Sequence, residues 1–190
     1  LRYDMVSYPD TGYGIDESRA VLASATRLPP GFNPRARALA QSLRAKFSDD
    51  RALMREVLAL FRNQSFFYTL TPPPLGTHTV DEFLFDTKSG FCEHYASAFA
   101  VLMRAAGIPT SIVTGYLGGE INPVGNYMIV RQADAHAWTE VWFSGEGWVR
   151  VDPTAAVSPL RVESGIGAAV PRTDPLPLIV FTPKSLLRHP

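Results

Sequence analysis

The sequence predicts an α+β fold, in which helices come first and an antiparallel sheet follows. Two observations support this class. Helix-type stretches with apolar residues on one face fill most of residues 33–106, and four short strand-type runs follow within residues 110–152. The two parts meet at "GIP", residues 107–109, where glycine and proline end the helical pattern.

The composition fits one globular domain with extended ends. The chain has 190 residues, enough to bury a core, of which 46% are hydrophobic and 19% charged. Because 18 basic residues balance 18 acidic ones, the charge does not predict nucleic acid or an anionic membrane as a partner. No run approaches the ~20 apolar residues of a membrane span. The first residue is Leu1, not methionine, so a membrane helix elsewhere in a longer parent chain is left open.

Both ends of the chain differ from its middle. Residues 1–32 are predicted to form an N-terminal extension with one short helix around residues 16–26, closed by the breaker "LPPGFNP". The main domain is predicted over residues 33–157. The sequence then becomes rich in proline, glycine and alanine, so residues 158–190 are expected to form a Pro-rich C-terminal extension.

Two predicted helices open the main domain. Asn33 is expected to cap the first, with Pro34 at its first helical position. Ser48 is expected to cap the second, with Asp49 and Asp50 in its first turn. Because each shows one apolar face, both are interpreted as packing elements. An extended segment, "SFFYTLTPPP", leads from them to the next helix.

The only cysteine, Cys92, lies at the polar start of the Ala-rich helical segment "SGFCEHYASAFAVLMRAAGIP". If Ser89 is the N-cap, Cys92 falls in the first turn, where unpaired backbone N–H groups and the helix dipole favour a thiolate. The same N–H groups are placed to stabilise an oxyanion. Cysteine is also among the most buried residue types, so position alone leaves a nucleophile and a small core residue equally open. One cysteine excludes an internal disulfide and a multi-thiolate zinc site.

Possible partners of Cys92 are found among the four histidines and in the sheet. His94 lies about 200° around the helix from Cys92, so it is disfavoured as a base. His136 stands at the head of the strand "AWTEVWF", and Asp152 closes the strand "WVRVD". Taken singly, each is most simply a surface histidine or a turn residue. Together they supply a base and its orienting carboxylate for Cys92.

Whether these two side chains can meet depends on the hairpin between their strands. A three-residue loop at residues 144–146 pairs Phe143 with Gly147 and makes His136 a diagonal neighbour of Asp152 on one face, about 7–8 Å away between backbones. A two-residue loop puts the two residues on opposite faces. The triad therefore requires the longer loop or a bulge.

Three segments, "SGFCEHYASAFAVLMRAAGIP", "ADAHAWTEVWF" and "WVRVDPT", resemble in this order the signature segments of the transglutaminase-like superfamily. The resemblance covers residues 66–154. It implies papain-like Cys–His–Asp chemistry on an α+β core, with the nucleophile at the N-terminus of a helix packed on an antiparallel sheet. Residue by residue, it implies Cys92 as nucleophile, His136 as general base and Asp152 as the orienting carboxylate.

The preceding segment "FFYTLTPPPLGTHTVDEFLFDTKSG" is most similar to bacterial inner-membrane proteins of the TgpA type. In these proteins a transglutaminase-like domain lies in the periplasm between membrane helices. The resemblance therefore implies a periplasmic domain that other parts of the parent chain tether to the membrane. It implies protein or peptide substrates that bear glutamine and a primary amine acceptor, with no cofactor and no nucleic acid. No calcium-loop pattern is present, so calcium activation does not carry over, and no metal site is expected.

The sequence also departs from the animal enzymes. Phe91 and Glu93 flank the cysteine where those enzymes carry glutamine and tryptophan, and their upstream oxyanion tryptophan has no counterpart. The Cys92 backbone N–H then needs a second oxyanion donor, for which Tyr68 is the candidate; a packing tyrosine is the alternative. Trp138 is a candidate wall of a substrate channel or a core aromatic.

Two further features bear on the substrate. Glu93 in the first helical turn is most simply a residue that compensates the helix dipole, but Glu93 or Glu140 could also hold a cationic amine. Residues 115–126, "GYLGGEINPVGN", are predicted to form a flexible loop and are a candidate lid.

Four functions are weighed. The favoured one is a cysteine acyltransferase of the protein-glutamine γ-glutamyltransferase type, working through a thioester with an amine as acceptor. A peptidase or deamidase keeps the triad but uses water. An arylamine N-acetyltransferase is disfavoured because its arginine-and-glycine lead-in to the cysteine is missing. The fourth is a non-catalytic peptide-binding module, against which an intact triad argues.

Overall fold

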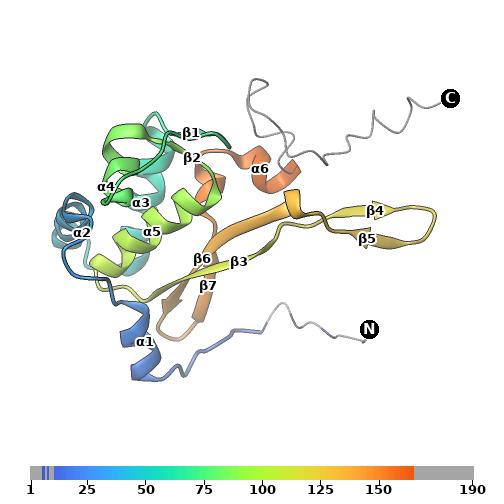
Figure 1. Ribbon diagram of the computed structural model, residues 1–190. Coiled ribbons are helices and arrows are strands. Elements are labelled where there is room, and N and C mark those ends of the chain that lie inside the picture. Colours follow the sequence, from blue (N-terminus) through green and yellow to red (C-terminus); the bar gives the residue numbers. More distant parts are fainter. Residues whose placement is uncertain (1–5, 7, 9–10, 165–190) are drawn as a thin grey trace.

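The helices pack beside a three-stranded antiparallel sheet, which confirms the α+β class, in a computed structural model that describes residues 6, 8 and 11–164 (Figure 1). The helices are α1 Arg19–Ala25, α2 Pro34–Lys46, α3 Asp50–Asn63, α4 Thr79–Asp81, the π-helix η1 Glu82–Thr87, α5 Cys92–Ala105, the 3₁₀-helices η2 Gln132–Asp134 and η3 Pro153–Ala156, and α6 Pro159–Ser164. The strands are β1 Phe67–Tyr68, β2 Ser89–Gly90, β3 Thr110–Tyr116, β4 Glu120–Asn122, β5 Tyr127–Ile129, β6 Ala135–Phe143 and β7 Gly147–Val151.

Helix α5 is the centre of the core. It contacts the strands β3 and β6 on one side and the helices α2 and α3 on the other. Its large apolar side chains, Tyr95, Phe99, Leu102 and Met103, are fully buried. The Tyr95 hydroxyl donates a hydrogen bond of 2.8 Å to the Phe67 carbonyl, which ties α5 to strand β1. The start of α5 is therefore held rigidly against the rest of the fold.

The sheet has the order β3–β6–β7, and the loop between β6 and β7 has the predicted length. Phe143 pairs with Gly147, so residues 144–146 form the three-residue turn, with positive φ at Gly145 and Gly147. From Ala137 to Phe143 the buried positions of β6 alternate, as period two predicts (Ala137, Thr139, Val141 and Phe143), and His136 before them is buried as well. The register that the triad requires is thus present.

The cap predicted at Ser89 is wrong. Ser89 lies in the short strand β2, which pairs in parallel with β1, and α5 begins after Phe91. Cys92 is nevertheless the first helical residue, as the prediction required. The partner strand is 22 residues upstream of Ser89 in the chain, since Phe67 pairs with Ser89. This long-range pairing replaces the local cap.

The caps of α2 and α3, the two helices that open the main domain, also differ from the prediction. Asn33 precedes α2 but has φ 53° and does not cap it with its side chain. The Asp81 carboxylate does so instead and accepts hydrogen bonds from the N–H groups of Arg35 (2.9 Å) and Ala36 (2.7 Å). Asn33 Oδ1 accepts from the Val80 N–H at 3.1 Å, so each helix start caps the other. Helix α3 is capped by the Asp49 side chain, one residue later than predicted.

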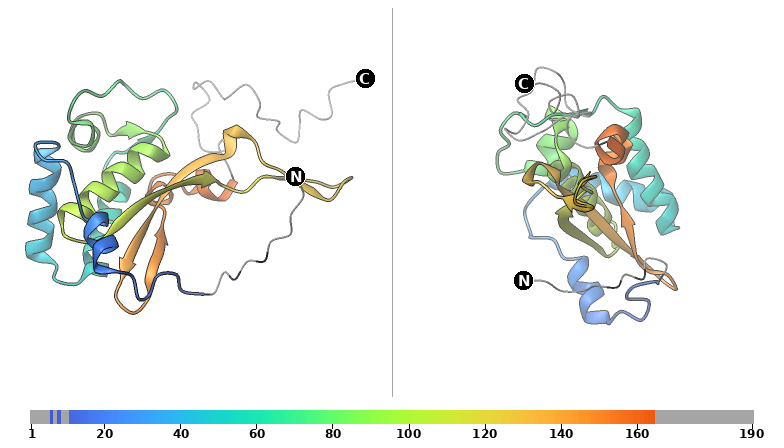
Figure 2. Two further views of the ribbon diagram at one scale, coloured as in Figure 1. Left: turned by 60° about the horizontal axis from the view of Figure 1, so that its bottom comes forward. Right: turned by 90° about the vertical axis from the view of Figure 1, so that its right-hand side faces the viewer.

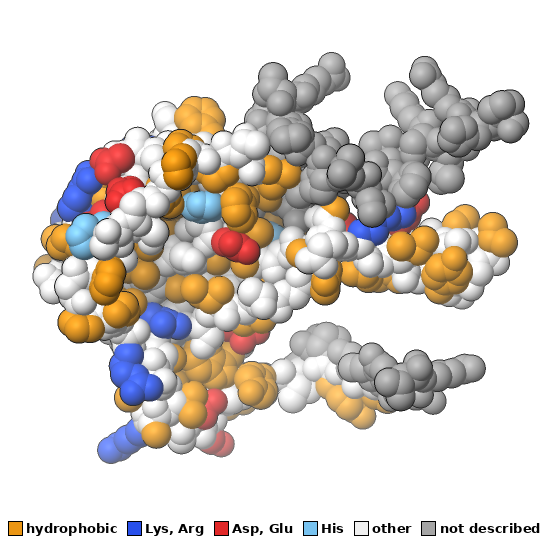
Figure 3. Space-filling model, viewed as in Figure 1, with side chains coloured by type: hydrophobic (Ala, Val, Ile, Leu, Met, Phe, Trp, Pro, Cys, Tyr) orange, Lys and Arg blue, Asp and Glu red, His pale blue; other side chains and the backbone are white. Residues whose placement is uncertain are grey.

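The predicted flexible loop at residues 115–126 contains a hairpin. Strand β4 pairs with β5, and the hairpin projects away from the helices (Figure 2). Four of its large apolar side chains are exposed, Ile121, Val124, Tyr127 and Met128, and orange side chains follow the whole arm in Figure 3. The segment therefore forms a paired hairpin in place of an irregular loop, and its role as a lid stays a prediction.

The predictions for the two chain ends can be compared with the structure only at the described residues. A short helix, α1, lies in the N-terminal extension, as expected. The start of the C-terminal extension forms α6, while residues 165–190 of the predicted Pro-rich tail lie outside the described residues. Over the described part of the chain, no helix has both the length and the apolar character to cross a bilayer.

Candidate active site

Cys92 is the first residue of α5, and its side chain faces the sheet. It packs with Ala96, one turn along the helix, and with Ala137 on β6. The first intrahelical bonds of α5 come from the N–H groups of His94 and Tyr95 to the Phe91 carbonyl. The N–H groups of Cys92 and Glu93 precede this ladder, at the positive end of a 14-residue helix. The sulfur therefore lies beside backbone donors of the kind that stabilise anions.

His136 and Asp152 meet across the β6–β7 hairpin. His136 Nε2 donates a hydrogen bond of 2.7 Å to Asp152 Oδ2. The His136 side chain is fully buried, and the Asp152 side chain is only 10% exposed. A buried imidazole that donates to a carboxylate from Nε2 keeps the lone pair of its neutral form on Nδ1. The arrangement fixes which nitrogen can act as the base.

Two contacts hold the carboxylate of Asp152 in this position. Asp152 caps the 3₁₀-helix η3, and its Oδ1 accepts a hydrogen bond of 3.1 Å from the Thr154 N–H. The preceding carbonyl, that of Val151, accepts a hydrogen bond of 2.7 Å from the buried Thr139 hydroxyl on β6. One oxygen of the carboxylate therefore caps η3, and the other binds His136.

The surroundings of His136 favour its charged form. Burial alone lowers the pKa of His136, but the hydrogen bond to Asp152, the nearby Cys92 side chain and the charges of both partners raise it above the ordinary value of 6.5. Among the described residues Nδ1 has no hydrogen-bond partner of regular geometry. The cysteine side chain is thus close enough to influence the imidazole without a tight bond. This is the relation expected between a thiol and the base that takes its proton.

Trp138 covers the imidazole. Its ring is stacked on that of His136, with 6.3 Å between centroids and 21° between planes. The Arg150 guanidinium lies 4.2 Å from the Trp138 ring centroid. Gly115 on β3 leaves room for the indole, because a Cβ there would lie 2.9 Å from it. The role of Trp138 as a substrate wall stays a prediction, but its contact with His136 places it at the site.

Tyr68 lies near the nucleophile in the backbone register. It pairs with Gly90, two residues before Cys92, and its side chain is 6% exposed within the main core. Its role as the second oxyanion donor stays a prediction.

His94 occupies the opposite side of the same helical turn. Its Nδ1 accepts a hydrogen bond of 3.3 Å from the Phe91 N–H, and its ring packs against Phe91 and Phe83. Burial lowers the pKa of His94, an effect that the Glu93 charge and the Phe91 backbone only partly offset. His94 is therefore neutral at pH 7 and serves the start of the helix.

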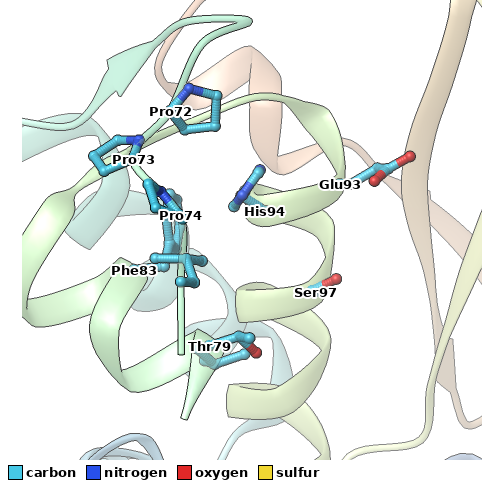
Figure 4. A pocket seen from close by; sticks show the side chains of 10 residues that line it. Pro72, Pro73, Pro74, Thr79, Phe83, Glu93, His94 and Ser97 are labelled. Atoms are coloured by element: carbon cyan, nitrogen blue, oxygen red, sulfur yellow. The ribbon is translucent and has the colours of Figure 1, made fainter. Parts of the chain in front are cut away.

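A cavity of about 370 Å³ lies beside the first two turns of α5 (Figure 4). One wall is the segment Pro72–Leu75, the floor includes Val80 and Phe83, and the helix contributes Glu93, His94 and Ser97. This cavity was not predicted from the sequence. The related signal in the sequence was the run of three prolines, whose fixed φ angles keep a segment extended.

The described residues hold no group of three or more His, Cys, Asp or Glu side chains that could bind a metal ion. A thiol, a buried imidazole and a carboxylate in this order can attack a carbonyl carbon and transfer its acyl group.

Comparison with known proteins identifies the family of the chain. A profile of the transglutaminase-like superfamily matches residues 37–153. A protein-glutamine gamma-glutamyltransferase of Pseudomonas aeruginosa is 54% identical over 144 residues, which are 76% of this chain and 22% of that protein. YebA of Bacillus subtilis, an uncharacterized protein, is 34% identical over 78% of this chain and 23% of its own length.

The fold has a solved relative. The crystal structure of the periplasmic domain of TgpA from Pseudomonas aeruginosa matches with a TM-score of 0.80 and 49% identity, over 82% of this chain and 54% of that one. The chain thus spans less than a quarter of the length of the two relatives from Pseudomonas aeruginosa and Bacillus subtilis, and about half of the solved domain.

Proposed function

The chain belongs to the transglutaminase-like superfamily, and from this premise we propose that it is a cysteine acyltransferase of the protein-glutamine γ-glutamyltransferase type. The observation that carries the proposal is the hydrogen bond of 2.7 Å between His136 and Asp152, next to a cysteine at a helix start. The 54% identity to a protein that bears this name supports the reaction type. The periplasmic location implied by the sequence resemblance agrees with the match to a periplasmic domain.

In the first half of the proposed reaction, His136 Nδ1 takes the thiol proton and Cys92 attacks the glutamine carboxamide. The oxyanion is held by first-turn N–H groups of α5. The imidazolium gives its proton to the leaving nitrogen, the C–N bond breaks, and ammonia departs. An acyl thioester remains on Cys92, and His136 is neutral again. Asp152 keeps the tautomer that makes Nδ1 the base.

In the second half, a neutral primary amine attacks the thioester carbonyl. His136 accepts the proton that the amine loses, and the C–S bond breaks to give an amide and the Cys92 thiolate. The imidazolium then returns its proton to the thiolate, which restores the thiol and the neutral His136 with which the cycle began. Water can replace the amine, and the product is then a glutamate side chain.

The test is intact-mass measurement after incubation with a glutamine-containing peptide, with and without a primary amine. We expect an acyl-enzyme on Cys92 and an amine-linked peptide, neither of which forms with Cys92→Ala. A deamidated or cleaved peptide at millimolar amine, without the amine-linked product, identifies a hydrolase instead. If the mass of neither enzyme nor peptide changes, the chain is a binding module.

A further inference from the structure

We propose that the Arg150 guanidinium and the Trp138 indole form a clamp that fixes the plane of the His136 ring, which makes Trp138 a positioning residue for the general base. The inference rests on the proposed function, because a base has to be oriented only if Cys92 reacts. It deepens that function by naming two side chains outside the triad, one in contact with the base and one that holds this contact in place.

The hydrogen bond to Asp152 does not by itself fix the orientation of the imidazole. It joins Nε2 of His136 to one carboxylate oxygen over 2.7 Å. Because Cγ and Nε2 lie on opposite sides of the five-membered ring, the ring can still turn about the line between them. The χ2 torsion of histidine has broad minima and resists this turn only weakly. The turn moves Nδ1 sideways, so a second contact has to keep Nδ1 directed toward Cys92.

The Trp138 indole supplies this second contact. The centroids of the indole and the His136 imidazole are 6.3 Å apart, and their planes are only 21° from parallel. This distance is within the range of offset-stacked aromatic pairs. A turn of the imidazole would tilt the two planes and push one edge of the imidazole toward the indole. The stack therefore opposes the motion that the hydrogen bond leaves free.

No hydrogen bond sets the position of this indole. Among the described residues, Trp138 Nε1 is buried without a hydrogen-bond partner. By contrast, Trp142 Nε1 on β6 donates to the Gly14 carbonyl at 2.8 Å. Trp148 Nε1 on β7 donates to Glu17 Oε2 at 3.2 Å. Since a buried N–H without a partner is unfavourable, the placement of Trp138 is not explained by its polar group, and the contacts of its ring have to explain it.

Arg150 and Gly115 provide these ring contacts. The Arg150 guanidinium lies 4.2 Å from the indole centroid, an attractive cation–π contact. In the register Arg150 pairs with Glu140, two residues after Trp138, whereas His136 is two residues before it. The cation and the imidazole thus lie on opposite sides of Trp138 along the strand. A Cβ on Gly115 would lie 2.9 Å from the indole Cη2, so only glycine leaves the ring its present place.

The experiment measures kcat and KM separately, with a glutamine peptide as donor and hydroxylamine as an acceptor that converts the thioester into a hydroxamate. Loss of a positioning contact lowers kcat, whereas loss of a substrate wall raises KM. Trp138→Leu should lower kcat about 10- to 100-fold, the effect of a small misplacement of reacting groups, and leave KM within about twofold. Trp138→Phe keeps a flat ring for the stack and should bring kcat back to within about threefold of wild type.

Two further variants disturb the clamp and leave Trp138 in the chain. Arg150→Met should lower kcat about two- to fivefold, the range for an exposed cation–π contact, and Arg150→Lys should restore part of the loss. Gly115→Ala displaces the indole and should lower kcat at unchanged KM. The matched control is Trp142→Leu, which removes an indole from the same face of β6 and breaks the bond to Gly14. It should lower the melting temperature and leave kcat unchanged.

The outcomes separate the clamp from the reaction itself. Three results overturn the clamp and leave the proposed function standing: a kcat within twofold of wild type in Trp138→Leu, a rise in KM alone in that variant, or an equal loss of kcat in Trp142→Leu. If a melt shows that Trp138→Leu is unfolded, Arg150→Met and Gly115→Ala decide by the same criteria. If wild-type enzyme forms no hydroxamate and releases no ammonia, the proposed function fails, and the clamp fails with it.

Discussion

Two histidines lie next to Cys92, one in space and one in sequence, and their surroundings give them opposite properties. His136 is hydrogen-bonded to a carboxylate, which helps to raise its pKa, whereas burial between aromatic rings lowers the pKa of His94. Closeness to Cys92 in the sequence therefore does not make His94 a general base. A carboxylate that is hydrogen-bonded to the imidazole stabilises its charged form, and of these two histidines His136 is the one with such a bond, to Asp152.

The same contrast divides the first turn of α5 into two sides. The side of Cys92 packs against Ala137 and the sheet, where the reacting groups are held. The side of Glu93 and His94 borders the cavity. One helical turn thus separates Cys92 from the cavity, and substitutions on the two sides should have different consequences.

The largest effect is expected at the carboxylate that defines the catalytic side. Asp152→Asn keeps the shape of the side chain but no longer fixes the Nε2–H tautomer of His136. Turnover should fall about 10³- to 10⁴-fold, by analogy with serine-protease triads. Hydroxamate formation measures the loss, and an unchanged circular-dichroism spectrum shows that the fold remains. Activity within tenfold of wild type would remove Asp152 from the mechanism.

The second effect concerns the room that His94 needs. A Cβ on Gly90 would lie 2.6 Å from His94 Cγ and 2.8 Å from its Cβ, which are the inflexible base of that side chain. Gly90→Ala should therefore destabilise the protein by about 1–3 kcal/mol, the usual cost of overpacking. Denaturant unfolding measures it. Gly31→Ala would not serve as a control. A Cβ on Gly31 would contact nothing, but its φ of +78° makes any side chain there unfavourable.

A better control for Gly90→Ala combines it with His94→Ala. Removing the imidazole should restore most of the lost free energy of unfolding if the clash is the cause. Equal losses in the single and double variants would place the strain elsewhere.

The third test measures the contrast directly. In an NMR titration the His136 ring should titrate above pH 6.5 and the His94 ring below it. Asp152→Asn should move the His136 midpoint down and leave His94 unchanged, since the carboxylate contacts only the first ring. Two midpoints on the same side of 6.5 would contradict the comparison.

The catalytic side could be predicted from the sequence because its geometry is local. The segment "SGEG" fixes the length of the β6–β7 turn, and the turn fixes the pairing of Phe143 with Gly147. The register from Phe143 and Gly147 to Thr139 and Val151 then follows, and it brings Asp152 next to the start of β6. The position of Cys92 at the start of a helix was also predicted from the local sequence, although the predicted N-cap, Ser89, was wrong.

The cavity side could not be predicted because its geometry is long-range. Ser89 pairs with Phe67, and the start of α2 is capped by Asp81, some 45 residues later in the chain. No local pattern carries such information. The distance between the proline segment and α5 depends on how these elements pack, so the sequence showed the prolines but not the space beside them.

The smallest effect is expected from His94 itself, and its sign follows from linkage. A histidine whose pKa is lowered on folding binds fewer protons in the native than in the unfolded state. The stability that depends on the neutral ring is fully present above pH 6.5 and is lost as the pH falls through the folded pKa. His94→Gln keeps an acceptor for the Phe91 N–H and removes this titration. Its stability relative to wild type should therefore improve as the pH falls from 7 to 5, while hydroxamate formation at pH 7 stays within about twofold. Denaturant unfolding at the two pH values measures the first effect. A stability difference that is independent of pH would show that His94 is not held neutral, and a large loss of activity would move it to the catalytic side of the turn.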